Sequence, residues 1–550
     1  MFKKNILKKV LMAAMAATLT FASVAPAYAK DITIHKGQYT SLSVADRFKA
    51  YQVFAGTPND PRNPHTLTNI TWGSGVTDGD NSFITDIQGD SIIGNTFNAV
   101  YTTWQNNQNA NKGTKAELVA RFLSNNATKS DFVKAFAKVA QKHAKGTCVT
   151  SALNGSDGWI IRGVENGYYL IVDTVAPESN ESASSFILNT TDSTDITIKS
   201  SIPKVEKKVK PNNKGNVAQI GDKIQYELTG TVANNIEDYT SYYYAFEDNL
   251  TAGLTVELDT VVVKIDGNNA PSDKYTVTVT PDNNEATKSP QKLLIEFKNL
   301  RDATLKVTPT STITVTYTAH LNKFVEVGGS SNNNSVILHF SNDPNKPSQH
   351  GKGTAGPGSI TKTYVFALDI TKYNGSETNP KTPLDGVTFV LKNAEGKEAK
   401  IEETNDGYKA ITEWVDAGSG SDLITAGSGK LKIKGFKDGE YTLHEKKAPD
   451  AFDTMRDIPI KITSTINQTT GELTTVTPSL RENRSDATIS DNDNNGIIEV
   501  TLTNYKSSIM PHTGGAGTTA LYVMSITIGV AGIAGLTIAL RKKGQRDKKD

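Results

Sequence analysis

The 550-residue sequence contains one cysteine, Cys148, so it cannot form a disulfide within the chain. Extracellular domains often depend on disulfides, and an exported protein without them needs large cores or another covalent crosslink. The sequence also lacks a phosphate-binding glycine loop, a zinc-ligand spacing and a Ser–His–Asp order. We therefore expect no metal, no cofactor and no turnover enzyme.

The sequence has almost no net charge, with 59 basic and 58 acidic residues. Its two ends are basic, however, and the body of the chain between them is acidic. Four lysines lie in residues 1–29, and six basic and two acidic residues follow Thr513. The remaining 49 basic and 56 acidic residues give a net charge of −7. An acidic body argues against binding to nucleic acid.

Long apolar runs are confined to the two ends. Residues 1–29 combine a lysine-rich start, an apolar middle and a final Ala27-Tyr28-Ala29, which is typical of a signal peptide cut after Ala29. Residues 517–540 carry no charge, are long enough to span a membrane, and precede the basic tail RKKGQRDKKD. The sequence thus predicts an exported protein with a C-terminal transmembrane helix.

Between the ends, the pattern predicts a mainly β protein of tandem Ig-like sandwich modules. We expect a β-rich first domain over residues 30–200, a second over 201–360 and a third over 361–508. The first includes a helical stretch, residues 113–145, within which Ser130 is the expected N-cap of the part that carries His143 as a solvated cation near its end. Its composition makes residues 341–359 a linker.

A short motif precedes the apolar run. Met510, Pro511, His512, Thr513 and Gly514 resemble the LPxTG sorting signal of Gram-positive surface proteins, with methionine in place of leucine. Motif, apolar span and basic tail occur in the order that such signals require, so residues 509–550 are interpreted as a cell-wall sorting signal. The resemblance implies that a sortase cleaves after Thr513 and transfers its acyl group to an amine.

Strand alternation in the third module points three polar side chains inward. Lys372 shares parity with apolar residues of its strand, and so do Glu445 and Asn504 in theirs. A buried lysine is costly when charged, so its pKa is expected to fall. A neutral amine is a nucleophile, and a protonated carboxyl can polarise an amide.

This trio and the segment LHEKKAPDAF resemble the Cna-B type domain of Gram-positive pilins and adhesins. In that segment Glu445 is the family's acid, and Ala451 stands where glycine is usual. The resemblance implies a spontaneous isopeptide bond between Lys372 and Asn504, assisted by Glu445.

The second module has a parallel set. AFEDNLTAGLTVE and NSVILHFSNDP resemble segments of the fimbrial D2-type domain, which makes Asp248 the assisting acid. The expected bond joins Lys207 and Asn334. Lys208 and Asn342 remain rivals, because runs of lysine and asparagine blur the register. No such bond is assigned to the first module.

Backbone pilins carry a lysine at the end of their first domain that attacks the acyl-threonine of the next subunit. Here the junction reads ITIKSSIPKVEKK, which offers Lys199, with Lys204 as the alternative. The favoured function is therefore a structural one: a Gram-positive major (backbone) pilin, located on the cell surface and anchored to the cell wall.

The expected partners are a pilus-specific and a housekeeping sortase, copies of the same chain, accessory pilins, peptidoglycan and host surface ligands. The alternative is a monomeric wall-anchored adhesin or accessory pilin that binds host matrix protein or glycan. The adhesin would share the signals and the β modules but would not need a junction lysine.

Overall fold

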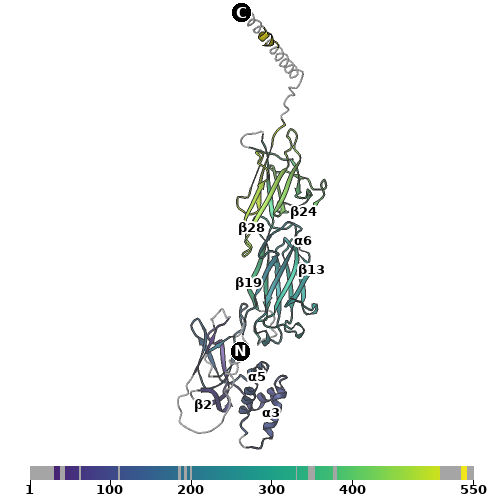
Figure 1. The fold of residues 1–550 in the computed structure, drawn as a ribbon. Helices are drawn as coiled ribbons and strands as arrows, with labels where there is room; N and C mark the ends of the chain where they lie inside the picture. The colour runs from purple at the N-terminus through teal and green to yellow at the C-terminus, as the bar shows by residue number, and fades with distance from the viewer. Residues whose placement is uncertain are drawn as a thin grey trace.

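The computed structural model places three β-rich domains one after another along an elongated molecule (Figure 1). It describes residues 30–37, 44–60, 63–109, 112–183, 187–190, 195–198, 201–329, 331–344, 353–375, 381–507, 534 and 536–541. The expected signal peptide, the motif at residues 510–514 and Lys199 lie outside these residues. No helix in the described part of the chain is long and apolar enough to cross a membrane. The predicted mainly β architecture of tandem modules is confirmed.

The first domain is a strongly curved sheet with helices against one face (Figure 1). Its strand order is β7-β6-β2-β4-β5-β1-β8, and β3 pairs with β2. The strands are β1 (Lys30–His35), β2 (Phe48–Asp60), β3 (Asn63–Trp72), β4 (Cys148–Leu153), β5 (Gly158–Val164), β6 (Gly167–Asp173), β7 (Ile187–Thr190) and β8 (Asp195–Thr197). The helical elements are η1 (Gly79–Phe83), α2 (Ile84–Gly89), α3 (Gly94–Asn106), α4 (Lys115–Asn125) and α5 (Ser130–His143).

The helical region differs from the expected single stretch in three ways. It forms two helices, α4 and α5, and the residue before α5 is Lys129, so the prediction of Ser130 as N-cap was wrong. Thr114 instead caps α4 in a reciprocal box with Glu117. His143 is only 8% exposed and lies 3.0 Å from an Asp86 carboxylate oxygen, so it is not a solvated cation.

The second domain is a sandwich of two sheets. One sheet has the order β10-β19-β18-β12-β16-β15 and the other the order β14-β13-β17-β11-β9. The strands are β9 (Val205–Lys210), β10 (Gly215–Val217), β11 (Lys223–Thr231), β12 (Tyr244–Leu250), β13 (Leu254–Ile265), β14 (Asn268–Asn269), β15 (Thr276–Thr280), β16 (Gln291–Phe297), β17 (Thr312–Leu321), β18 (Asn332–Phe340) and β19 (Gly353–Tyr364). Alternate residues of β17 and β18 are buried between the sheets, as expected for a two-layer core.

The segment expected to be a linker is structured where the structure describes it. Residues 353–359 begin β19, which pairs antiparallel with β18 and parallel with β10. The glycines, proline and serine of this segment suggested a loop, but pairing to β18 satisfies its backbone groups and overrides composition. The sheet of the second domain therefore extends to Tyr364.

The third domain has one twelve-stranded sheet folded around its core. The strands are β20 (Phe366–Asn374), β21 (Thr382–Pro383), β22 (Thr388–Asn393), β23 (Glu398–Glu403), β24 (Lys409–Val415), β25 (Leu423–Ile424), β26 (Lys430–Phe436), β27 (Gly439–Lys447), β28 (Ile458–Ile466), β29 (Leu473–Leu480), β30 (Ala487–Ser490) and β31 (Ile497–Asn504). The first and last long strands, β20 and β31, are parallel neighbours. The two ends of the domain's chain thus leave from adjacent strands.

Polar contacts join the second and third domains. The buried Lys434 Nζ donates to the carbonyl oxygen of Val325 at 3.1 Å and pairs with Asp406 at 2.6 Å. Lys437 pairs with Asp222 across the same junction at 3.0 Å. These contacts fix how one domain follows the other.

The capping box of α4 yields a stability prediction for the first domain. Thr114→Ala removes the hydroxyl that accepts from the Glu117 amide at 3.1 Å, and should destabilise this domain by about 1 kcal/mol. Urea unfolding followed by tryptophan fluorescence measures it, since Trp72, Trp104 and Trp159 all lie in this domain.

The matched control is Thr103→Ala on α3, where the exposed hydroxyl donates only within its own helix. This change should stay within about 0.5 kcal/mol of the parent. Equal losses for the two variants would contradict the capping assignment.

Candidate functional site

The third-domain site collects three polar side chains in the core. Lys372, Glu445 and Asn504 are 0%, 3% and 1% exposed, so the inward orientation predicted from strand alternation is confirmed. They come from β20, β27 and β31. In the β20–β31 register Lys372 lies opposite Leu502 and Asn374 opposite Asn504, so the lysine and the asparagine are diagonal neighbours on one face.

One carboxylate bridges the other two groups. Glu445 Oε2 lies 3.1 Å from Lys372 Nζ, and Glu445 Oε1 accepts from Asn504 Nδ2 at 2.5 Å. The thioether sulfur of Met455 contacts the same ammonium at 2.5 Å, and the Phe389 ring centroid lies 5.5 Å from it. The amine, the acid and the amide therefore form one contiguous cluster under an apolar cover.

Burial changes the acid–base balance of this cluster. Removal from water lowers the pKa of Lys372 to about 8, although the nearby Glu445 carboxylate opposes the shift. A lysine with this pKa has a substantial neutral fraction near pH 8, and the neutral form is the nucleophile.

The second-domain site has the same three kinds of group in another arrangement. Lys207 lies on β9, whereas Asp248 and Asn334 lie on β12 and β18 of the other sheet, and all three are 0% exposed. Lys207 Nζ lies 2.5 Å from Asp248 Oδ2. A bond between Lys207 and Asn334 would thus connect the two sheets of the sandwich.

A tyrosine completes this second cluster. The Tyr317 hydroxyl donates to Asp248 Oδ2 at 2.5 Å, accepts from Asn334 Nδ2 at 2.6 Å and lies 3.0 Å from Lys207 Nζ. Burial lowers the pKa of Lys207 to about 8 and raises that of Asp248, and these shifts favour the neutral amine and the protonated acid.

The rival residues lie elsewhere. Lys208 pairs with Glu206 on the surface at 3.5 Å. The side-chain nitrogen of Asn342 donates to the carbonyl oxygens of Glu178 and Glu181, which belong to the first domain. The structure therefore brings Lys207 and Asn334 to Asp248, and places Lys208 and Asn342 away from it.

The candidate intermolecular amines are at the first junction. Lys204 is exposed immediately before β9, where its backbone amide donates to the Thr231 hydroxyl at 2.8 Å. Lys199 falls outside the described residues, as do all five residues of the sorting motif. These assignments stay predictions.

Sequence reasoning missed Tyr317 and Met455. Tyr317 shares parity with Ile313, Val315 and Ala319 on β17, and it brings a polar group to the inward face of that strand. This signal was available in the alternation of STITVTYTAHL. Met455 lies in an irregular segment between β27 and β28, where no periodicity indicates its direction.

At one position the backbone fits the resemblance of LHEKKAPDAF to the Cna-B type domain. Ala451 has a φ of 73°, in the left-handed region that glycine adopts without steric cost. This conformation explains physically why glycine is usual there, and why alanine at this position is strained.

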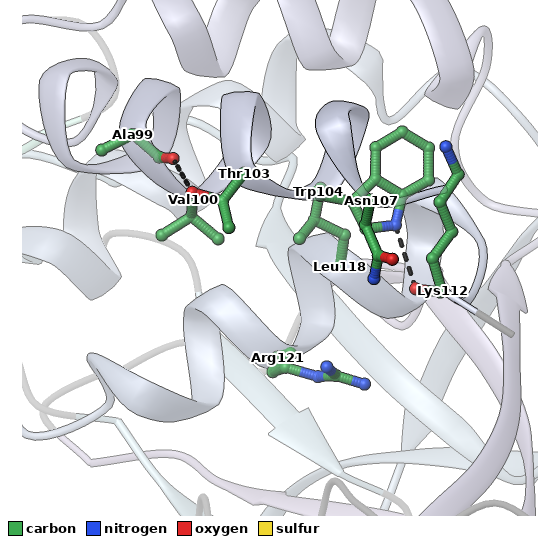
Figure 2. Close-up of a pocket in the computed structure, with 8 residues that line it drawn as sticks. All are labelled: Ala99, Val100, Thr103, Trp104, Asn107, Lys112, Leu118 and Arg121. Carbon is green, nitrogen blue, oxygen red and sulfur yellow. Dashed lines mark hydrogen bonds between the residues drawn. The ribbon is translucent and has the colours of Figure 1, made fainter. Parts of the chain in front are cut away.

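The first domain contains a cavity, and no comparable cluster occurs among the residues of this domain that the structure describes. A hollow of 520 Å³ lies between α3 and α4, and Figure 2 shows the side chains that line it. The indole nitrogen of Trp104 donates to the Lys112 carbonyl oxygen at 3.1 Å, and the Lys112 ammonium lies 4.6 Å from the ring centroid (Figure 2). The lining combines the Trp104 ring with the basic side chains of Lys112 and Arg121.

The two clusters define a class: a modular β-sandwich protein with a lysine, an acid and an asparagine buried together in each of two successive domains. A family model described as the SpaA prealbumin-like fold domain matches residues 367–477. This stretch of the third domain thus has a prealbumin-like fold. No curated protein matches the chain at a significant level.

Among solved structures, the chain is similar to the T6 backbone pilin of serotype M6 Streptococcus pyogenes, described as having a modular three-domain structure. The two are 15% identical, the match covers 88% of this chain and 100% of that one, and the TM-score is 0.51. The full-length major pilin SpaD from Corynebacterium diphtheriae is 17% identical, with 89% and 100% covered and a TM-score of 0.42. BcpA, the major pilin subunit of Bacillus cereus, is 17% identical, with 66% and 92% covered and a TM-score of 0.38.

The chain therefore shares the three-domain fold of the T6 pilin, and the resemblance to Gram-positive backbone pilins is confirmed at the level of fold. At these sequence identities, the matches show a shared fold. Assembly into pili is a property of the matched proteins.

The lowered lysine pKa can be measured directly. In an Asn504→Ala variant, which lacks the carboxamide of this cluster, the free amine of Lys372 should have a pKa of about 8. An NMR pH titration of ¹³C-lysine-labelled protein measures this midpoint, and Lys372→Met in the same background assigns the signal. A midpoint at the ordinary value of about 10.4 would contradict the desolvation account.

Proposed function

We propose that this chain is the shaft subunit of a covalent Gram-positive pilus, with an internal lysine–asparagine isopeptide bond in each of its second and third domains. The observation that carries the proposal is the pair of fully enclosed clusters, in which an amine and a carboxamide touch a common acid or its tyrosine partner. Three such groups cost free energy when buried, and a reaction among them explains their presence.

The chemistry in the third domain needs no added reagent. A proton moves from Lys372 Nζ to Glu445, and the neutral amine forms a bond to Asn504 Cγ. As the Cγ–Nδ2 bond breaks, Glu445 gives its proton to the departing nitrogen and takes one from Nζ. The products are the Lys372–Asn504 amide, ammonia and a protonated Glu445.

The proposed bonds have a mechanical consequence. Since β20 and β31 are the first and last long strands of the third domain and lie side by side, a covalent link between them carries tension past the rest of the sheet. In the second domain the link clamps the first strand, β9, to the opposite sheet. Such domains would resist unfolding and proteolysis without disulfides.

Assembly would depend on the sorting motif at residues 510–514 and on a lysine at the junction of the first and second domains. A pilus-specific sortase would cleave after Thr513 and join its acyl group to Lys199 of the next subunit, with Lys204 as the alternative. A housekeeping sortase would attach the finished polymer to peptidoglycan on the cell surface. Accessory pilins and host surface ligands complete the proposed partners. In this proposal the chain is a substrate of sortase, and each of its two internal bonds forms once, without turnover.

The polymerisation step is testable by co-expression with a pilus-specific sortase. We expect the parent chain to form high-mass ladders on denaturing gels, and Lys199→Ala to abolish them. Lys208→Ala, an exposed lysine of the second domain, is the matched control and should leave the ladders unchanged.

Two outcomes would contradict the proposal at different levels. Ladders that persist in the Lys199→Ala, Lys204→Ala double variant would show that the junction assignment is wrong. A parent chain that is cleaved after Thr513 but never polymerises would instead favour the wall-anchored adhesin.

A further inference from the structure

The two clusters differ in how the acid reaches the amide. In the third domain the two carboxylate oxygens of Glu445 contact Lys372 and Asn504 directly, at 3.1 and 2.5 Å. In the second domain Asp248 uses Oδ2 for Lys207, and its other oxygen is buried without a hydrogen-bond partner in the part of the chain that the structure describes. The aspartate side chain is one methylene shorter than glutamate, and the Tyr317 hydroxyl lies between Asp248 and Asn334.

From this difference, which rests on the proposed function, we infer that Tyr317 is a catalytic residue of the second-domain crosslink and relays a proton between Asp248 and the departing nitrogen of Asn334. Its hydroxyl oxygen contacts all three reacting groups, within 2.5 to 3.0 Å. The third-domain cluster has Met455 at the equivalent contact to the amine, and a thioether cannot donate a proton.

The environment holds the hydroxyl in place. Tyr317 is 1% exposed, and its ring stacks on Tyr226 with centroids 5.3 Å apart. The Lys207 ammonium lies 4.8 Å from the Tyr226 ring centroid and 5.2 Å from that of Tyr317. The rings of Tyr226 and Tyr317 therefore lie against the Lys207 amine, and their stacking holds the Tyr317 hydroxyl toward Asp248.

The relay balances in protons and charge. Lys207 Nζ first gives a proton to Asp248, and the neutral amine bonds to Asn334 Cγ. As the Cγ–Nδ2 bond breaks, Asp248 donates to the Tyr317 oxygen while the Tyr317 hydroxyl proton passes to Nδ2, and Asp248 then takes a proton from Nζ. The amide, ammonia and protonated Asp248 result, and Tyr317 is unchanged.

The test follows both bonds in one chain. The full-length protein is made in a cell-free reaction and sampled over time. Digestion and mass spectrometry then give the fraction of Lys207 joined to Asn334 with loss of one ammonia. Tyr317→Phe should slow this bond by about 100-fold, a typical contribution of positioned acid–base groups, and leave the Lys372–Asn504 bond at the parent rate.

Two further variants separate relay from packing. Tyr242→Phe removes a buried phenol of the same domain that lies outside the cluster and has no hydrogen-bond partner among the described residues, and should crosslink at the parent rate. Asp248→Glu added to Tyr317→Phe lengthens the acid toward Asn334 and should recover part of the rate. The unchanged third-domain bond shows in each variant that the chain has folded beyond the site.

The outcomes test the proton relay separately from the proposed isopeptide bond on which it rests. A parent chain that never forms the second-domain bond would overturn both. A parent that forms it, with Tyr317→Phe at the same rate, would overturn the relay alone. The relay also fails if Tyr242→Phe is as slow as Tyr317→Phe, or if the Asp248→Glu, Tyr317→Phe pair is no faster than Tyr317→Phe.

Discussion

The free-energy cost of burying a lysine ammonium constrains the cores of the second and third domains. Lys207 and Lys372 are each 0% exposed, and a lysine held there as an isolated cation would cost several kcal/mol. Each domain offsets this cost with a carboxyl group within 3.1 Å, aromatic rings around the amine and a carboxamide within reach of the acid or its tyrosine partner. These same requirements leave an amine of lowered pKa beside an amide, which is the arrangement that a condensation with loss of ammonia needs.

The two clusters meet one requirement with different topologies. In the third domain the lysine and the asparagine lie on adjacent parallel strands, and a glutamate from β27 spans both. In the second domain the lysine lies on one sheet and the amide on the other, with an aspartate and a tyrosine between them. The first domain follows another plan: no lysine among its described residues is buried, and its buried cation, Arg47, pairs with Asp173 at 3.0 Å. A guanidinium is not an amine nucleophile.

Much of this arrangement is predictable from sequence because strand alternation has a period of two. The parity of apolar residues around Lys372, Glu445 and Asn504 was enough to place all three inside, and the same parity favoured Lys207 while leaving Lys208 as a rival. Contacts that depend on which strands face each other were not predictable. Alternation indicates that Tyr317 points inward but not that it meets Asp248 and Asn334 of the opposite sheet, and Met455 reaches Lys372 from an irregular segment that has no periodicity. The linker prediction failed because glycine and proline composition cannot anticipate that β18 offers an unpaired edge to residues 353–359. Likewise, the Ser130 cap was misplaced because the helical stretch divides at residues 126–129.

The central claim is that each cluster becomes a covalent bond, and the mass of the intact body is its most direct test. A protein comprising residues 30–508, purified and measured by high-resolution mass spectrometry, should be lighter than its sequence by two ammonia molecules. Fragmentation of the protein should then yield two crosslinked peptide pairs, one that contains Lys207 bonded to Asn334 and one that contains Lys372 bonded to Asn504. A body with the full sequence mass would contradict the account and would leave both clusters as buried ion pairs with a hydrogen-bonded amide.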